Sequence, residues 1–197
     1  GAYDDYWRTN VVGTEAVIAA CRAEGVPRLV FTSSPSVAHG GGDIEGLDES
    51  APYPMRYAAA YPETKARAER AVLAANGPSL ATIALRPHLV WGPGDTNLTP
   101  RILERARRGR LVLVGGGRKK IDATHIDSAV HAHLCALDRL APGAPCAGRA
   151  YFVAQGEPMP LRDLVFGILA AYDLPPRARS VPRPIAVALG GAVELGW

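Results

Sequence analysis

A tyrosine and a lysine four residues apart, Tyr61 and Lys65, have the side chains in this sequence best suited to proton transfer. In a helix this spacing places both side chains on one face, one turn apart. A phenol has a reference pKa of about 10 and is a poor acid or base at neutral pH. A neighbouring ammonium lowers that pKa, so the hydroxyl can exchange a proton with an alcohol or carbonyl. The spacing alone is weak evidence, because any helix can hold an exposed tyrosine beside a solvated lysine.

Hydroxyl groups follow the short apolar run RLVFT at residues 28–32, a pattern typical of a strand covered on both faces. Thr32, Ser33 and Ser34 stand at the end of this strand, where open α/β sheets bind their ligands. A serine there can hydrogen-bond a substrate oxygen while the tyrosine transfers its proton and the lysine holds a ribose hydroxyl. The Ser-Ser-Pro sequence by itself favours a turn. In combination with the tyrosine and the lysine, it favours catalysis.

Strands and helices alternate along the chain, which indicates a parallel sheet of βαβ units. We therefore predict an α/β fold, a doubly wound, Rossmann-like parallel sheet with a small C-terminal substrate lobe. Residues 1–95 would form the C-terminal part of a dinucleotide-binding domain, and residues 96–197 would complete the sheet and form the lobe. Helices are expected at residues 11–24, 57–76, 100–108, from 127 or 128 to 140, and 161–172, and strands at 28–32, 80–85, 111–114 and 151–154.

The composition is that of an ordinary globular protein, with 48% hydrophobic and 21% charged residues. The net charge of +3 gives no reason to expect a nucleic-acid partner. Three cysteines without a CxxC pair leave an odd thiol, which favours a reducing cytoplasm. The polar, acidic start does not have the form of a signal peptide. The apolar segment 185–197 is shorter than the about 20 residues of a membrane span, and is expected as a packed core helix or a membrane-apposed one.

Two histidines and a basic cluster are further candidate sites. His131 and His133 are two residues apart on a predicted helix, so their side chains point about 200° apart and cannot chelate one ion. We interpret both as structural residues and expect no metal. The basic cluster at residues 101–110 lacks the interleaved aromatic residues of a nucleic-acid site. We therefore interpret it as a solvated face.

Five motifs in order along the chain resemble those of the extended short-chain dehydrogenase/reductase family. The resemblance covers residues 10–155 and continues more weakly to the end. The motifs are NVVGT from Asn10, RLVFTSS from Arg28, YPETK from Tyr61, LRPHLVWGPGD from Leu85 and DATHID from Asp122.

Within that family the chain is most similar to the 3β-hydroxysteroid dehydrogenase group. This group includes sterol-4-carboxylate 3-dehydrogenases and bacterial 2-alkyl-3-oxoalkanoate reductases. Ala38 stands where sugar-nucleotide epimerases usually carry an aromatic residue, which argues against that branch. The segments most similar to the group are AVLAANG from Ala71, ALRPHLVWGPGD from Ala84, VHAH from Val130 and GEPMP from Gly156.

The resemblance implies a role for each matching residue. Tyr61 would be the proton donor or acceptor, and Lys65 would bind the nicotinamide ribose and lower the tyrosine pKa. Ser34 would hydrogen-bond the substrate oxygen, with Ser33 as the alternative, and Ser36 would line the substrate side. The cofactor would be NAD or NADP. His88 is equally well explained as a histidine after a strand whose hydrogen bonds are satisfied within the protein. Asn10 is expected as a structural anchor rather than a catalytic residue. Cofactor contacts are expected from Tyr61, Lys65, Thr32, Pro87, His88 and Val90.

The implied function is reversible hydride transfer between a nicotinamide and a secondary alcohol or ketone on a large apolar substrate, sterol-like or long-chain 3-oxoacyl. The alternatives are a nucleotide-sugar epimerase or dehydratase with the same three residues, and a non-catalytic nucleotide sensor or scaffold on the same fold. The sequence lacks the family's initial glycine-rich turn and the residue that selects NAD or NADP. We therefore expect an N-terminally incomplete protein. Dimerisation is usual in the family, and a homodimer is an open expectation.

Overall fold

The computed structural model describes residues 2–40 and 46–186. The chain divides into two units, the first formed by Gly1–His88 with Asp127–Ala154 and the second by Leu89–Ile126 with Gln155–Trp197. The expected boundary at residue 95 falls inside the second unit, and residues 127–154 return to the first. Apart from its first two residues, the apolar segment 185–197 lies outside the described residues.

The first unit is built on a parallel three-stranded sheet in the order β1–β2–β7. Its strands are β1 Arg28–Thr32, β2 Ala81–Pro87 and β7 Arg149–Val153. The first six residues of β2 are buried, because this central strand is covered on both faces. The α/β fold with a parallel sheet is therefore confirmed.

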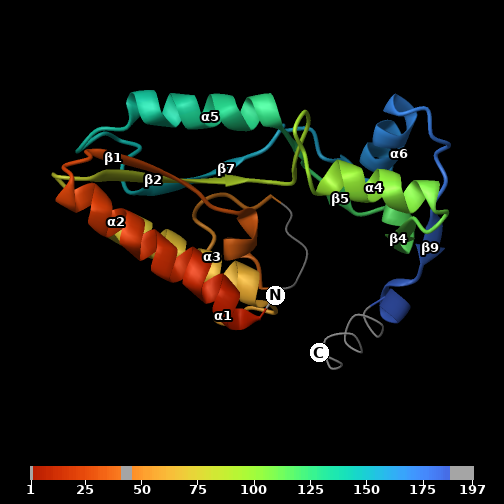
Figure 1. Cartoon of the computed structure of the whole chain (residues 1–197), viewed down its shortest axis with the longest axis horizontal. Coiled ribbons are helices and arrows are strands. Elements are labelled where there is room, and N and C mark those ends of the chain that lie inside the picture. Colours follow the sequence, from red (N-terminus) through yellow and green to blue (C-terminus); the bar gives the residue numbers. More distant parts are fainter. Residues whose placement is uncertain (1, 41–45, 187–197) are drawn as a thin grey trace. The chain divides into compact units, whose positions relative to one another are not determined.

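Helices cover both faces of this sheet. Helices α2 (Gly13–Ala23) and α3 (Ala60–Ala74) lie on one face and α5 (Ile126–Arg139) lies on the other (Figure 1). The helical segment predicted for residues 11–24 begins earlier, since α1 (Tyr3–Tyr6) and the π-helix η1 (Trp7–Val12) lead directly into α2.

Apolar side chains form a separate cluster on each face of the sheet. On the face of α2 and α3, the cluster contains Ile18, Val72 and Leu80. On the face of α5, it contains residues of β2 together with Ala136 and Leu140. The sheet is thus fixed from both sides, which sets the position of the carboxyl ends of its strands.

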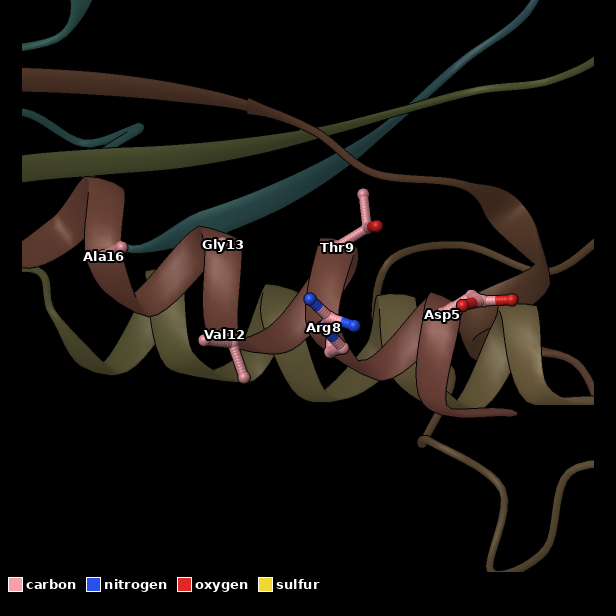
Figure 2. Close-up of a pocket in the computed structure, with 6 residues that line it drawn as sticks. All are labelled: Asp5, Arg8, Thr9, Val12, Gly13 and Ala16. Carbon is pink, nitrogen blue, oxygen red and sulfur yellow. The ribbon is translucent and has the colours of Figure 1, made fainter. Parts of the chain in front are cut away.

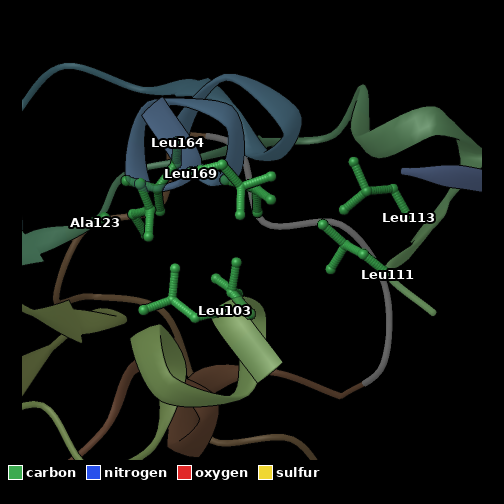
Figure 3. Packing of buried hydrophobic residues seen from close by; sticks show 9 residues of the cluster. Leu103, Leu111, Leu113, Ala123, Leu164 and Leu169 are labelled. Atoms are coloured by element: carbon green, nitrogen blue, oxygen red, sulfur yellow. The ribbon is translucent and has the colours of Figure 1, made fainter. Parts of the chain in front are cut away.

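The described part of the second unit contains α4 (Leu98–Arg107), the 3-10 helix η3 (Gly115–Gly117) and α6 (Leu161–Ala171), together with three pairs of short strands. Leucines from α4, β4 and α6 converge in its core (Figure 3). Several strands have only two residues, too few for a recognisable apolar pattern, and the sequence did not predict them. The pairs are β3 (Val90–Trp91) with β6 (Thr124–His125), β4 (Val112–Val114) with β9 (Arg179–Val181), and β5 (Lys120–Ile121) with β8 (Met159–Pro160).

A search of residues 2–40 and 46–186 for membrane spans finds no helix with the length and apolar character needed to cross a bilayer.

Candidate active site

Lys65 is held at the carboxyl end of β1. Its Nζ donates a hydrogen bond to the carbonyl oxygen of Thr32 at 2.7 Å and lies 4.2 Å from the centroid of the Phe31 ring. Burial lowers the pKa of Lys65, and the negative charge of Glu69 offsets part of that lowering. An ammonium has three N–H donors, so two remain after the bond to Thr32. The fold thus brings together a helix and a strand end that are 33 residues apart.

Tyr61 lies on the first turn of α3 with its side chain 41% exposed. Its ring makes an edge contact with Tyr6, with 6.0 Å between the centroids. Among the described residues, no hydrogen bond joins its hydroxyl to Lys65 or Ser34. Tyr61 and Lys65 are four apart in one helix and therefore share a face. Tyr61 as a whole is partly exposed to solvent.

Ser33 and Ser34 have different surroundings. Ser33 is 5% exposed, and its Oγ is buried without a hydrogen-bond partner. Ser34 Oγ accepts a hydrogen bond from the backbone N–H of Ser36 at 3.3 Å and lies 2.9 Å from Ser36 Oγ. Ser34 thereby caps the short 3-10 helix η2, Pro35–Ala38. Of the two candidates, Ser34 is the half-buried one and has Ser36 beside it.

The side chain of Thr32 contacts helix α5. Thr32 Oγ1 lies 2.8 Å from His133 Nε2, and His133 Nδ1 lies 2.8 Å from the carbonyl oxygen of Ala129. A carbonyl oxygen only accepts, so in the neutral ring Nδ1 carries the proton and Nε2 accepts from the threonine hydroxyl. Sequence reasoning missed His133 as a neighbour of the site because 101 residues separate it from Thr32. The sequence feature that could have pointed to His133 is the VHAH segment that contains it.

The two histidines of that segment have different partners, as their spacing indicates. His131 Nε2 lies 3.3 Å from the exposed Cys135 Sγ, whereas His133 contacts Thr32. Within residues 2–40 and 46–186, no three His, Cys, Asp or Glu side chains are grouped so that they could hold a metal ion.

A buried ion pair joins α3 to β2, and the sequence did not predict it. Arg86 donates to Glu69 through Nε at 3.0 Å and through Nη2 at 2.6 Å, and the Tyr53 hydroxyl donates to the same carboxylate at 2.5 Å. The side chains of Glu69 and Arg86 are 0% and 3% exposed. The sequence feature that could have revealed this pair is Arg86, a charged residue at the end of a largely apolar strand, because a buried guanidinium requires a partner.

Hydrogen bonds decide the charge state of this cluster. Burial alone would raise the pKa of Glu69, but the hydrogen bonds from Arg86 and Tyr53 outweigh burial and lower it. Ser33 contributes to that lowering, although its hydroxyl does not reach hydrogen-bond geometry. Burial makes the largest contribution to raising the pKa of Tyr53, and the hydrogen bond to Glu69 raises it further. Ser33 therefore faces the buried charges, which leaves Ser34 as the serine of the open strand end.

The remaining predicted residues fall on both units. Pro87 ends β2, and the backbone N–H of His88 donates to the carbonyl oxygen of Val153 at 3.1 Å. Val90 begins β3 in the second unit, where it pairs with Thr124. The structure thus places Pro87 and His88 with the first sheet and Val90 with the second unit.

Asn10 lies in the π-helical turn η1. Its amide Nδ2 donates to Oγ1 of Thr64, a fully buried residue of α3, at 3.0 Å. This is the contact of the polar anchor predicted for Asn10, and it ties the N-terminal helical segment to the helix of Tyr61 and Lys65.

The described structure has two hollows that none of the predicted catalytic residues lines. One, of about 450 Å³, follows the face of α1, η1 and α2 (Figure 2). The other, of about 200 Å³, lies along residues 90–97 in the second unit. The first is lined by Asp5, Arg8, Thr9, Val12, Gly13 and Ala16. The candidate site is therefore defined by side-chain chemistry at the strand end, and not by either hollow.

Solved structures share this fold. The chain is similar to UDP-glucose 4-epimerase of Thermus thermophilus, solved in complex with NAD, with a TM-score of 0.71 and 25% identity, covering 89% of this chain and 58% of that one. It is also similar to dTDP-glucose 4,6-dehydratase of Streptomyces venezuelae, with a TM-score of 0.75 and 24% identity, covering 92% and 55%. The chain has the Rossmann-like fold of these enzymes, and the predicted fold class is confirmed.

Sequence comparison identifies the family. The model of the 3-beta hydroxysteroid dehydrogenase/isomerase family matches residues 2–183. A 2-alkyl-3-oxoalkanoate reductase of Stenotrophomonas maltophilia is 53% identical over 199 residues, which cover all of this chain and 60% of the relative. Mouse sterol-4-alpha-carboxylate 3-dehydrogenase, decarboxylating, is 38% identical over 175 residues, covering 86% of this chain and 48% of the relative. The chain belongs to the 3-beta hydroxysteroid dehydrogenase/isomerase family, as predicted, and spans 60% or less of these relatives.

Proposed function

We propose that the protein containing this chain is an NAD(P)-dependent oxidoreductase that interconverts a secondary alcohol and a ketone on a large apolar substrate. The observation that carries the proposal is the Lys65 ammonium held at the end of β1, 2.7 Å from the Thr32 carbonyl oxygen, on the helical face of Tyr61. The relatives support the substrate class, because their names describe chemistry at C3 of a 3-oxoalkanoate and of a sterol.

The residues present fit a nicotinamide cofactor. Lys65 stands at the carboxyl end of a parallel strand, where dinucleotides bind in this fold, and it keeps two N–H donors for a ribose hydroxyl. The Thr32 hydroxyl already bonds His133, so this residue would act through its carbonyl. Pro87 and His88, at the carboxyl end of β2, would contact the nicotinamide, and a cofactor contact of Val90 stays a prediction. When bound, the cofactor supplies or receives the hydride.

The proton chemistry belongs to the chain itself. In the reducing direction Tyr61 gives its hydroxyl proton to the substrate oxygen, and Ser34 donates a hydrogen bond to the same oxygen. Lys65 lies one helical turn from Tyr61 on the same face of α3. Ser36, 2.9 Å from Ser34 between the hydroxyl oxygens, would line the substrate side.

The setting of the reaction is also a proposal. Cys21, Cys135 and Cys146 are free thiols, which supports a cytoplasmic location. A role in sterol or lipid metabolism follows from the apolar substrate. The homodimer and the contact of residues 185–197 with membrane stay predictions.

A substrate panel tests the proposal against its runner-up. The solved epimerase and dehydratase structures of the same fold favour a nucleotide sugar as the second candidate substrate. The full-length protein would be assayed with a 2-alkyl-3-oxo acid and a 3-ketosteroid, following reduced nicotinamide by absorbance, and with UDP-glucose, following the sugar product by chromatography because epimerisation causes no net change in the nicotinamide. We expect turnover with one of the two ketones and none with UDP-glucose. Turnover of UDP-glucose alone would replace the proposal by the runner-up.

Tyr61→Phe tests the mechanism. Removing the hydroxyl should lower kcat by about 100-fold or more, the usual contribution of a positioned general acid. Tyr172→Phe is the matched control, since Tyr172 is 52% exposed and lies in the second unit. Turnover of Tyr61→Phe equal to that of the control would refute the mechanism.

A further inference from the structure

Helices α3 and α5 lie on opposite faces of the three-stranded sheet (Figure 1). Both contact Thr32, the last residue of β1. Helix α3 reaches it through Lys65, whose Nζ donates to the Thr32 carbonyl oxygen at 2.7 Å. Helix α5 reaches it through His133, whose Nε2 lies 2.8 Å from Thr32 Oγ1. We infer that His133 is a positioning residue, which holds the catalytic Lys65 in place through Thr32. The inference rests on the proposed function.

The alternation of side chains along β1 explains why one strand serves both helices. Successive residues of a strand face opposite sides of a sheet. Phe31 faces α3, where its ring lies under Lys65 Nζ and packs on the cluster of Ile18 and Val72. Thr32 faces α5 and His133. In the described part of the chain, no hydrogen bond or ion pair joins Lys65 to α5 directly, and the last residue of β1 connects them.

The peptide between Thr32 and Ser33 is fixed at three points. The Ser33 N–H donates to the carbonyl oxygen of Leu85 in β2 at 2.6 Å. The carbonyl of a trans peptide points away from its N–H, so the Thr32 oxygen faces away from β2 and meets Lys65. The bond to His133 holds the side chain of the same residue, whose β-branch restricts rotation about χ1. Loss of that bond leaves the peptide free to tilt about its remaining contacts.

The imidazole is itself held at both nitrogens. Nδ1 donates to the carbonyl oxygen of Ala129, one turn earlier in α5, at 2.8 Å. This bond sets the ring orientation and leaves Nε2 as the acceptor for the Thr32 hydroxyl. The direction of the hydrogen bonds therefore runs from Thr32 to His133 to the backbone of α5, which is packed on the sheet through Ala136 and Leu140.

A purely structural role would have a different consequence from a positioning role. Helix α5 is already fixed by its apolar cluster, so one half-exposed hydrogen bond adds little to the packing. A displacement of about 1 Å at a catalytic group, in contrast, can lower turnover by about 100-fold. The two roles are therefore separated by comparing turnover with thermal stability.

Thr32→Val and His133→Leu test the inference in the full-length protein. Thr32→Val keeps the shape and removes only the hydroxyl, and His131→Leu is the matched control on the same helix, since His131 contacts Cys135. We expect each test variant to lower kcat by roughly 10-fold, a fraction of the loss given by a full displacement, with Tm nearly unchanged. The double variant should be no worse than either single one. His133→Gln should recover part of the loss, because its amide oxygen can accept the same bond.

Acetylation of Lys65 in the cofactor-free protein, followed by mass spectrometry, gives a readout independent of turnover. We expect faster acetylation in Thr32→Val and His133→Leu than in His131→Leu. A lowered Tm with unchanged kcat and unchanged acetylation in the test variants would overturn the inference. If the substrate panel shows no ketone reduction while the acetylation rates change, the proposed function fails and the positioning of Lys65 stands.

Discussion

Replacing Glu69 by glutamine would remove one charge of the buried ion pair and leave the other. Glu69 and Arg86 have side chains 0% and 3% exposed, joined by two hydrogen bonds of 3.0 and 2.6 Å. Arg86 Nη1 is buried and has no hydrogen-bond partner in the described part of the chain. The guanidinium that remains in Glu69→Gln would therefore have no compensating charge.

Breaking a buried pair from one side costs about 3–5 kcal/mol, because an uncompensated charge stays buried. The same substitution at Glu63, on the same helix, is the matched control. Glu63 pairs with Arg67 at 3.0 Å, but these side chains are 30% and 51% exposed, so its loss should cost about 0–1 kcal/mol. The difference between two substitutions of one chemical kind isolates the effect of burial.

Urea unfolding of the two variants, followed by circular dichroism, measures this difference. We expect Glu69→Gln to lower the free energy of unfolding by at least about 2 kcal/mol more than Glu63→Gln, given those two ranges. Tyr53→Phe, which removes one bond to the carboxylate, should fall between them at about 1.5–3 kcal/mol. Equal effects of the two glutamine variants would show that the Glu69–Arg86 pair is not buried in the folded protein.

Two further predictions concern the turn that precedes α4. Asp95 accepts hydrogen bonds from the backbone N–H groups of residues 97–99, which lower its pKa to about 2 although burial opposes the shift. Asp95→Ala should cost about 0.5–2 kcal/mol of unfolding free energy. Because the pKa of Asp95 in the folded protein is below its unfolded value, that contribution is present above pH about 4 and disappears as the pH falls towards 2. An equal loss of unfolding free energy in Asp95→Ala at pH 2 and at pH 7 would contradict this. Gly92→Ala should lower the free energy of unfolding by about 1–3 kcal/mol, because the new Cβ would lie 2.7 Å from Ile126 Cγ2 and the φ of 135° disfavours a side chain. Gly94→Ala is the control, since Gly94 also has a positive φ but has open space around it. Equal losses of Tm in the two variants would exclude the clash.

The sequence alone determined the parts of the site that depend on local geometry. Tyr61 and Lys65 share a helical face because a period of 3.6 residues places positions four apart in line, and α3 contains both. Strand β1 has the bounds expected for it, because RLVFT is an unbroken apolar run that ends before Ser-Ser-Pro. The family followed from five motifs whose order is itself visible in the sequence.

Only the tertiary structure decided which side chains meet across the chain. The contacts of Lys65 with Thr32, Arg86 with Glu69 and His133 with Thr32 join residues 33, 17 and 101 positions apart. No local pattern encodes such pairs, because they form when helices pack on opposite faces of a sheet. The two serines make the same point. They follow β1 directly in the sequence, yet Ser33 Oγ is buried whereas Ser34 is half-buried and lies beside Ser36.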